Sequence, residues 1–290
     1  MVKKIRIIRP LNLAIIAATM LVICIKYRYE DAENYIQLLV FLILPAVLTA
    51  AAGYVVNDIY DVRVDQINKP EKVLVGQYIS RRNAWLVYVA LTLCSLIVSY
   101  LFSDQYAVIN LSLTLLLFLY SLKLKGTPLI GNLVIALCSS AVIAMCMLYD
   151  REGNKIIHFD TLAAFYNYVS YIIFSFFISL IREIVKDMQD IEGDTSAGLK
   201  TYPILVGLKG AKILVYVVTA MEIVFCGLYT AFVFFAADML VSPVIMGLIT
   251  LSLFYFINRL ARAKQSHEFG RSSVLLKVIM FAGVINLIFS

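Results

Sequence analysis

The stretch that decides the fold runs from Tyr35 to Asp65 and reads YIQLLVFLILPAVLTAAAGYVVNDIYDVRVD. Its first part, Tyr35–Val56, is apolar and long enough to cross a bilayer, which takes about 20 helical residues. Three aspartates, Asp58, Asp61 and Asp65, follow almost directly. The stretch therefore predicts a membrane-spanning helix that ends in a cluster of carboxylates.

Apolar runs of the same kind recur along the chain, in which 62% of the 290 residues are hydrophobic and 15% are charged. This composition is far from that of a soluble domain. The runs are continuously apolar, whereas the strands of a membrane barrel alternate. We therefore predict an all-α polytopic membrane protein with a single transmembrane domain, residues 1–290, and nine spanning helices. The expected spans are Leu11–Ile25, Tyr35–Val56, Ala84–Phe102, Ala107–Leu122, Thr127–Leu148, Leu162–Ile181, Ala211–Ala237, Met239–Phe256 and Val274–Phe289.

The basic residues predict the orientation, because short cytoplasmic loops collect Lys and Arg. With a cytoplasmic N-terminus, all but four of the 25 Lys and Arg residues fall on the inner side. We therefore expect a multi-pass protein of a prokaryotic cell membrane whose acidic segments face the cytoplasm. The net charge of +6 then reflects topology. No basic helix with interleaved aromatic residues suggests a nucleic-acid partner, and we expect no obligatory protein partner.

The acidic segment after the second span has a counterpart after the sixth. Asp187–Asp194 reads DMQDIEGD and repeats the pattern D-x-x-D-x-x-x-D of Asp58–Asp65. Carboxylates at this spacing lie on one face of a helix, and both segments follow an even-numbered span, so both open on the same side. One such segment alone could be a solvated acidic helix end. Two with the same spacing favour a site in which six aspartates converge, namely Asp58, Asp61, Asp65, Asp187, Asp190 and Asp194.

Converging carboxylates repel one another and need a cation. Mg²⁺ is usually held by one or two carboxylates together with phosphate oxygens of a substrate. The six aspartates therefore predict a Mg²⁺–diphosphate site, in which they act as metal ligands and catalytic groups. Polar and basic side chains nearby could contact the substrate through charge-assisted bonds. These candidates are Asn12, Asn57, Arg63, Tyr120, Lys123, Lys125, Arg182, Lys186 and Lys200, and for Asn12 a hydrogen bond between helices is an equal alternative.

The two motifs, the first preceded by Asn57, and the predicted nine spans resemble the UbiA superfamily of intramembrane prenyltransferases over essentially the whole chain. The resemblance implies a helical bundle around a central cavity and Mg²⁺-dependent transfer of a polyprenyl group from its diphosphate to an acceptor. Three stretches resemble one branch, the geranylgeranylglycerol-phosphate geranylgeranyltransferases, whose donor is geranylgeranyl diphosphate and whose acceptor is geranylgeranylglyceryl phosphate. They are Arg9–Asn12, Pro128–Asn132 and Arg182–Pro203.

Other functions stay open at this point. The acceptor could instead be an aromatic quinone or haem precursor, and the general base is not identified. A cation transporter or channel is the alternative from another class, since intramembrane acids can bind a transported ion. The aspartates lie at span ends, however, and Glu222, the acid well inside a span, has no obvious partner and fits a packed residue better than a catalytic one. A purely structural membrane protein would leave the duplicated motif unexplained.

Overall fold

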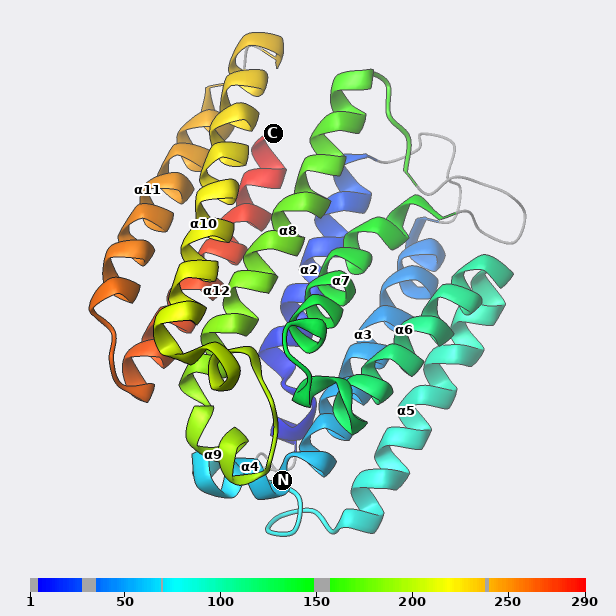
Figure 1. Ribbon diagram of the computed structural model, residues 1–290. Coiled ribbons are helices and arrows are strands. Elements are labelled where there is room, and N and C mark those ends of the chain that lie inside the picture. The colour runs from blue at the N-terminus through cyan, green and yellow to red at the C-terminus, as the bar shows by residue number, and fades with distance from the viewer. Residues whose placement is uncertain (1–4, 28–34, 69, 149–156, 238–239) are drawn as a thin grey trace. The chain divides into compact units, whose positions relative to one another are not determined.

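The computed structural model describes residues 5–27, 35–68, 70–148, 157–237 and 240–290 (Figure 1). Within these ranges the chain is helical apart from its connections and an isolated bridge between Val75 and Ile79. The chain divides into two compact units, each described by itself below. Unit 1 comprises residues 1–125, 142–158 and 196–198, and unit 2 comprises residues 126–141, 159–195 and 199–290.

The described residues contain eight helices that are long and apolar enough to cross a membrane, and α2 (Pro10–Lys26) is a shorter apolar helix. The predicted all-α membrane fold is thus confirmed, with the count of nine approximate. The long helices are α3 (Tyr35–Tyr60), α5 (Arg81–Phe102), α6 (Asp104–Leu122), α7 (Ile130–Ala144), α8 (Leu162–Gln189), α10 (Tyr202–Ala237), α11 (Val241–Arg262) and α12 (Ser266–Phe289). Between them lie α4 (Val62–Asn68), α9 (Ile191–Ser196) and the 3-10 turns η1 (Arg6–Ile8), η2 (Pro70–Lys72), η3 (Leu124–Gly126) and η4 (Met145–Met147).

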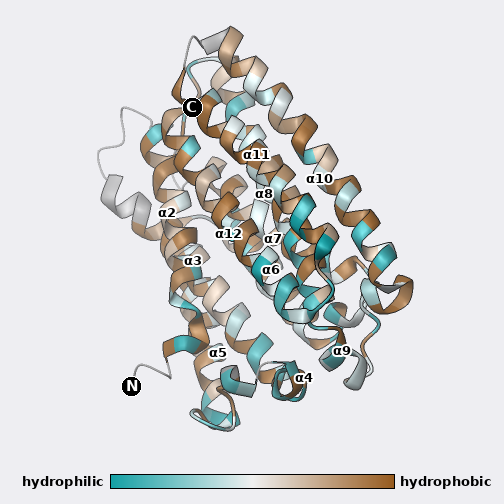
Figure 2. Cartoon of the chain, turned by 90° about the vertical axis from the view of Figure 1, so that its left-hand side faces the viewer, coloured by the Kyte–Doolittle hydropathy of each residue, from teal (hydrophilic) through white to brown (hydrophobic). Residues whose placement is uncertain are grey.

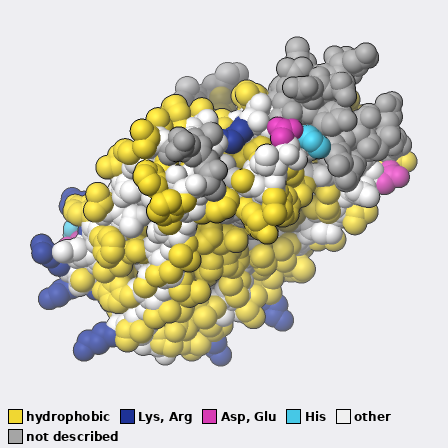
Figure 3. Space-filling model, turned by 90° about the horizontal axis from the view of Figure 1, so that it is seen from above, with side chains coloured by type: hydrophobic (Ala, Val, Ile, Leu, Met, Phe, Trp, Pro, Cys, Tyr) yellow, Lys and Arg dark blue, Asp and Glu magenta, His cyan; other side chains and the backbone are white. Residues whose placement is uncertain are grey.

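The outward surfaces of these helices are apolar. Figure 2 shows hydrophobic residues along most of the length of the long helices, and in Figure 3 hydrophobic side chains cover much of the face in view, with Lys and Arg mainly near its edge. The side chain of Phe235 on α10, for example, is 85% exposed. In water such a surface would be strongly unfavourable, whereas lipid chains solvate it at no cost. The chain is therefore an integral membrane protein.

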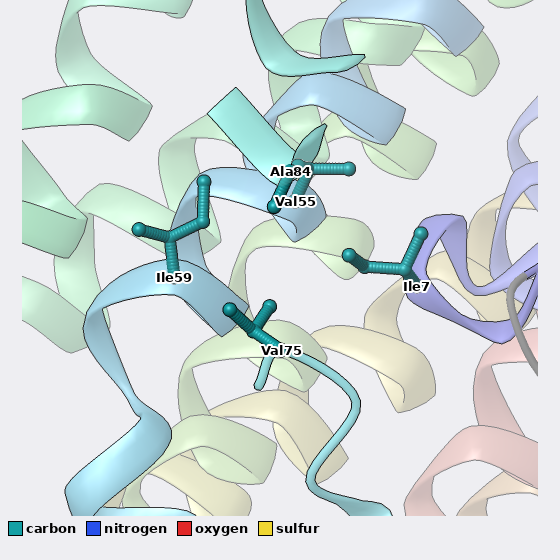
Figure 4. Close-up of a cluster of buried hydrophobic side chains, with 5 residues drawn as sticks. All are labelled: Ile7, Val55, Ile59, Val75 and Ala84. Carbon is teal, nitrogen blue, oxygen red and sulfur yellow. The ribbon is translucent and has the colours of Figure 1, made fainter. Parts of the chain in front are cut away.

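Unit 1 is built around α3, which packs against α2, α5 and α6. Near the C-terminal end of α3, Val55 and Ile59 are buried against Ile7 of η1, Val75 and Ala84 (Figure 4). These contacts hold η1 and the segment after η2 beside the last turns of α3. The end of α3, where the first acid motif begins, is thus fixed by apolar packing.

Hydrogen bonds between helices also stabilise unit 1. The Thr49 hydroxyl on α3 donates to Asn110 Oδ1 on α6 at 2.6 Å, and Asn110 Nδ2 donates to Ser95 and Ser99 of α5 at 2.7 Å. All four side chains are buried. Polar side chains that bond across helices are a usual means of association in membranes, where apolar burial between helices gives little.

Unit 2 has α8 at its centre, packed against α10 and α12, and α11 completes the unit. Close approach of α8 and α12 needs a residue without a side chain, because a Cβ atom added at Gly283 would lie 2.4 Å from the ring of Phe174. Buried hydrogen bonds join α8 to both neighbours: Tyr229 of α10 donates to Asn167, and Asn286 of α12 donates to Tyr171, each at 2.8 Å.

Candidate active site

Both acid motifs lie where a spanning helix meets a short helix. The sequence placed the first motif between spans, but α3 continues to Tyr60 and so carries Asp58. Asp61 occupies the turn, and Asp65 lies on α4. The helix thus extends beyond the predicted end of the span at Val56, because helical hydrogen bonding continues where the apolar run ends. The Asp65 N–H still donates to the Asp61 carbonyl oxygen at 2.8 Å.

The second motif repeats this arrangement in unit 2. Asp187 lies on α8, which extends well past the predicted end of the span at Ile181, and Asp190 caps α8. Asp194 lies on α9 and is 1% exposed. The Asp194 N–H donates to the Asp190 carbonyl oxygen at 3.0 Å. Each motif thus bends between two helices while keeping helical backbone bonds, rather than forming one straight helical face.

In the first motif, Asp58 is ion-paired with Arg9. The Arg9 guanidinium donates to Asp58 Oδ1 at 2.7 Å and lies 4.7 Å from the centroid of the Tyr54 ring. Burial lowers the pKa of Arg9, but the interactions with Asp58, Tyr54 and Asp61 together outweigh it, so the pKa is raised. Arg9 has a positive φ of 51°, an uncommon conformation outside glycine that tends to occur at functional sites. The turn before α2 therefore delivers a cation to the first motif.

Asp61 is the other strongly engaged carboxylate of unit 1. Its side chain is 8% exposed, and Lys125, on η3, donates to Oδ2 of this carboxylate. Asn57, one turn earlier on α3, donates its amide to the same oxygen at 2.6 Å. Two of the predicted substrate-contacting residues, Asn57 and Lys125, thus touch the motif.

In the second motif, Asp187 accepts a hydrogen bond from the Asn132 amide of α7 at 2.7 Å. One turn before Asp187 on α8, Glu183 is buried and binds both Arg182 and Lys186 at 2.8 Å. The predicted cations Arg182 and Lys186 therefore lie on the same helix as Asp187, but both are ion-paired with Glu183.

The remaining predicted residues have less direct placements. Arg63, Lys123 and Lys200 are exposed, whereas Asn12 and Tyr120 are half-buried. Because the two motifs belong to different units, the expected convergence of all six aspartates stays a prediction.

The oxygen ligands that the two motifs offer can be compared with the coordination that a divalent cation requires. No group of three or more His, Cys, Asp or Glu side chains that could hold a metal occurs among the described residues. Mg²⁺ does not require one, since one or two carboxylates suffice when phosphate oxygens and water complete the shell. The carboxylate and amide oxygens of both motifs are the hard ligands that Mg²⁺ prefers. The residues present therefore fit a Mg²⁺ ion shared with a phosphate-bearing substrate.

Three residues of these contacts were missing from the predicted site, namely Arg9, Asn132 and Glu183. Arg9 and Asn132 are far in sequence from the aspartates that they bind, so helical spacing could not reveal them. Glu183 could have been found, because it lies four residues before Asp187 and three before Lys186, on the same helical face. Glu222 is fully buried on α10, and the Cys226 thiol donates to its carboxylate at 3.9 Å.

Apolar spanning helices with carboxylate clusters at their ends define a polytopic membrane protein with a polar site at helix ends. The model of the UbiA prenyltransferase family matches residues 14–279. The chain belongs to the UbiA prenyltransferase family, and the resemblance drawn from its motifs is confirmed.

Relatives and solved structures agree with this assignment. A digeranylgeranylglyceryl phosphate synthase of Methanobrevibacter smithii is 31% identical over 97% of this chain and 95% of the relative, and one of Thermococcus gammatolerans is 32% identical over 87% and 84%. A structure from work on digeranylgeranylglyceryl phosphate synthase in membranes has a TM-score of 0.71 at 21% identity, covering 99% of this chain and 96% of that one. A UbiA homologue from Archaeoglobus fulgidus bound to DMAPP and Mg²⁺ has a TM-score of 0.67 at 23% identity, covering 98% and 99%. These two structures share the fold of this chain.

Proposed function

We propose that this protein transfers a geranylgeranyl group from geranylgeranyl diphosphate to the free hydroxyl of geranylgeranylglyceryl phosphate. The observation that carries the proposal is the 31% identity to a digeranylgeranylglyceryl phosphate synthase over 97% of the chain. The reaction also suits the site, because both substrates are apolar chains with anionic headgroups. A membrane protein with cations at the ends of its helices can bind both kinds of group.

The charges of the two motifs support a divalent cation as part of this site. Asp58, Asp61 and Asp65 in unit 1 and Asp187, Asp190 and Asp194 in unit 2 would hold Mg²⁺. Bound Mg²⁺ would neutralise charge on the departing diphosphate. Three of these aspartates are already bound by a protein cation or amide, namely Asp58 by Arg9, Asp61 by Lys125 and Asp187 by Asn132. Donor binding therefore exchanges part of these contacts, with Arg9 and Lys125 turning from carboxylate to phosphate oxygens.

The chemical step is a substitution at the first carbon of the donor. The bond from this carbon to oxygen breaks, and its electron pair leaves with the diphosphate. The acceptor hydroxyl oxygen forms the new ether bond and loses its proton to a carboxylate or to water. Lys125, Arg182 and Lys186 stabilise the leaving group through charge-assisted hydrogen bonds. The apolar helices keep water from the allylic cation, which would otherwise be hydrolysed.

The orientation of the site is a second part of the proposal. The distribution of Lys and Arg supports a cytoplasmic site, where a water-soluble diphosphate headgroup is available. Gln77 lies exposed in the segment between α4 and α5 and offers a position for labelling. In a variant without other cysteines, Gln77→Cys should react with a membrane-impermeant maleimide in inside-out vesicles and not in right-side-out vesicles. Labelling in right-side-out vesicles alone would place the site on the other face.

A competition between acceptors tests the substrate assignment. Purified protein in lipid nanodiscs receives radiolabelled geranylgeranyl diphosphate, Mg²⁺ and equal amounts of geranylgeranylglyceryl phosphate, 4-hydroxybenzoate and 1,4-dihydroxy-2-naphthoate. We expect label in the glycerol lipid and none in the aromatic products. Label in an aromatic product instead would reject the acceptor and keep the prenyl transfer, whereas no product with any acceptor would argue against both.

A further inference from the structure

Glu183 binds two cations at once, one turn before Asp187 on α8. Its Oε1 accepts from Arg182 Nη1 and its Oε2 accepts from Lys186 Nζ, each at 2.8 Å. The Glu183 side chain is 5% exposed. A buried carboxylate is expensive unless cations or hydrogen bonds offset its desolvation, and here each oxygen has a cationic partner. The three side chains therefore form one compact charged group.

Asp187 has a different kind of partner from Asp58 and Asp61. In unit 1 the protein cations bind the motif directly, Arg9 at Asp58 and Lys125 at Asp61. In unit 2 the neutral amide of Asn132 binds Asp187. A cation seated on a carboxylate uses the lone pairs that a metal ion needs. Because Arg182 and Lys186 are ion-paired with Glu183, the partner of Asp187 is neutral. Lone pairs of the Asp187 carboxylate then remain for a metal ion.

A second, independent observation on the Arg182 side chain points to a ligand. Its Nε is buried and has no hydrogen-bond partner within the described residues. Buried donors without an acceptor are costly and rare in native proteins. Glu183 uses one of the five guanidinium donors, so others are left for an anion. A phosphate oxygen would satisfy such a donor.

Of the two cations, Lys186 is the one better placed to form an ion pair with Asp187. It is the adjacent residue, and its charge already acts on the Asp187 carboxylate. The flexible four-carbon stem of lysine allows the ammonium to change partners. If Glu183 lost its charge, Lys186 would be drawn to Asp187.

We propose that Glu183 is a positioning residue that holds Arg182 and Lys186 away from Asp187, which keeps Asp187 available to a divalent cation and the remaining donors of both cations available to the diphosphate. This inference rests on the proposed function, because it assumes that Asp187 binds the metal. It adds a role for a carboxylate that itself binds neither metal nor substrate.

The test measures metal affinity without turnover. Binding of Mn²⁺ alone to purified full-length protein in nanodiscs is followed by the electron paramagnetic resonance of free Mn²⁺. Four variants are compared with the wild type, namely Glu183→Gln, Lys186→Gln, the double variant, and Glu192→Gln as the control. Glu192 is an exposed acid on α9 between two motif aspartates, so its loss removes the same charge near the motif without freeing a cation.

We expect Glu183→Gln to weaken Mn²⁺ binding by about tenfold, the effect of one misplaced charge-assisted contact. Lys186→Gln should bind at least as well as the wild type, and Glu192→Gln should lose less than about threefold. The Mn²⁺ affinity of the double variant should recover to within about threefold of that of Lys186→Gln, because the lysine that would pair with Asp187 is absent. A role of Glu183 in packing alone predicts no recovery.

Wild-type affinity in Glu183→Gln, or a double variant as weak as Glu183→Gln, would overturn the proposal. If Glu183→Gln does not fold, the double variant decides. A folded double variant that binds Mn²⁺ like Lys186→Gln supports the proposal, whereas an unfolded or non-binding one contradicts it. Mn²⁺ binding by the wild type without prenyl transfer would count against the proposed function alone and would leave this comparison valid.

Discussion

Lys125 offers the sharpest mutational test of the site, because Lys123, Lys125 and Lys200 are all predicted substrate contacts but differ in their surroundings in the structure. Lys125 has a side chain that is 21% exposed and is paired with the buried Asp61, whereas Lys123 and Lys200 are exposed. Lys125→Ala removes a charge-assisted contact worth about 1.5 to 3 kcal/mol. If Lys125 turns to the diphosphate when the donor binds, kcat/KM for geranylgeranyl diphosphate should fall by about tenfold to more than a hundredfold.

Lys123→Ala is the matched control, two residues earlier in the same turn. Its exposed charge should contribute less than about 1 kcal/mol, so its kcat/KM should stay within about fivefold of the wild type. Initial rates at varied donor concentration in nanodiscs measure both variants, and a thermal melt checks that each is folded. We also expect Lys125→Ala to unfold more easily, by about 1 to 3 kcal/mol, because the buried Asp61 loses its cation. A Lys125→Ala enzyme with wild-type kcat/KM, or equal losses in both variants, would refute the reasoning.

Three further changes probe other contacts. Asn132→Ala removes the amide that orients Asp187 and should weaken Mn²⁺ binding by about tenfold in the same resonance assay; unchanged affinity would remove Asn132 from the site. Asn110→Ala breaks the buried bonds between α3, α5 and α6 and should lower the free energy of unfolding by about 1 to 3 kcal/mol without changing the KM for the donor. The control Ser112→Ala loses only a bond within its own helix and should have the melting temperature of the wild type. Gly283→Val places side-chain atoms against the Phe174 ring and should lower the melting temperature or prevent folding; a wild-type melt would mean that α8 and α12 can separate without cost.

The spanning helices could be predicted from the sequence because lipid-facing and buried positions of a membrane helix are both apolar, so no periodicity has to be recognised. The ends were harder. The predicted sixth span stopped at Ile181, where charged residues begin, but α8 continues to Gln189. Backbone hydrogen bonding does not depend on apolar side chains, and the helix therefore carries Asp187 beyond the hydropathy signal.

The six aspartates could be predicted from the sequence because their spacing repeats along the chain, and several cations because polar and basic residues near these motifs can bind a phosphate. Their partners could not be predicted in this way. Arg9 binds Asp58 because the turn before α2 adopts a left-handed conformation at Arg9, and no local sequence pattern predicts this conformation. Asn132 reaches Asp187 from another helix, a contact set by packing. Helical spacing does connect Glu183 with Lys186, but only the structure shows that this buried acid takes both neighbouring cations.

Dependence of product formation on a divalent cation tests the central claim most directly. The purified protein is stripped with excess EDTA, incubated with labelled geranylgeranyl diphosphate and geranylgeranylglyceryl phosphate, and then titrated with Mg²⁺. We predict no digeranylgeranylglyceryl phosphate and no release of inorganic diphosphate in the chelator, and recovery of both in equal amounts as Mg²⁺ is added. Full product formation in excess EDTA would contradict the account.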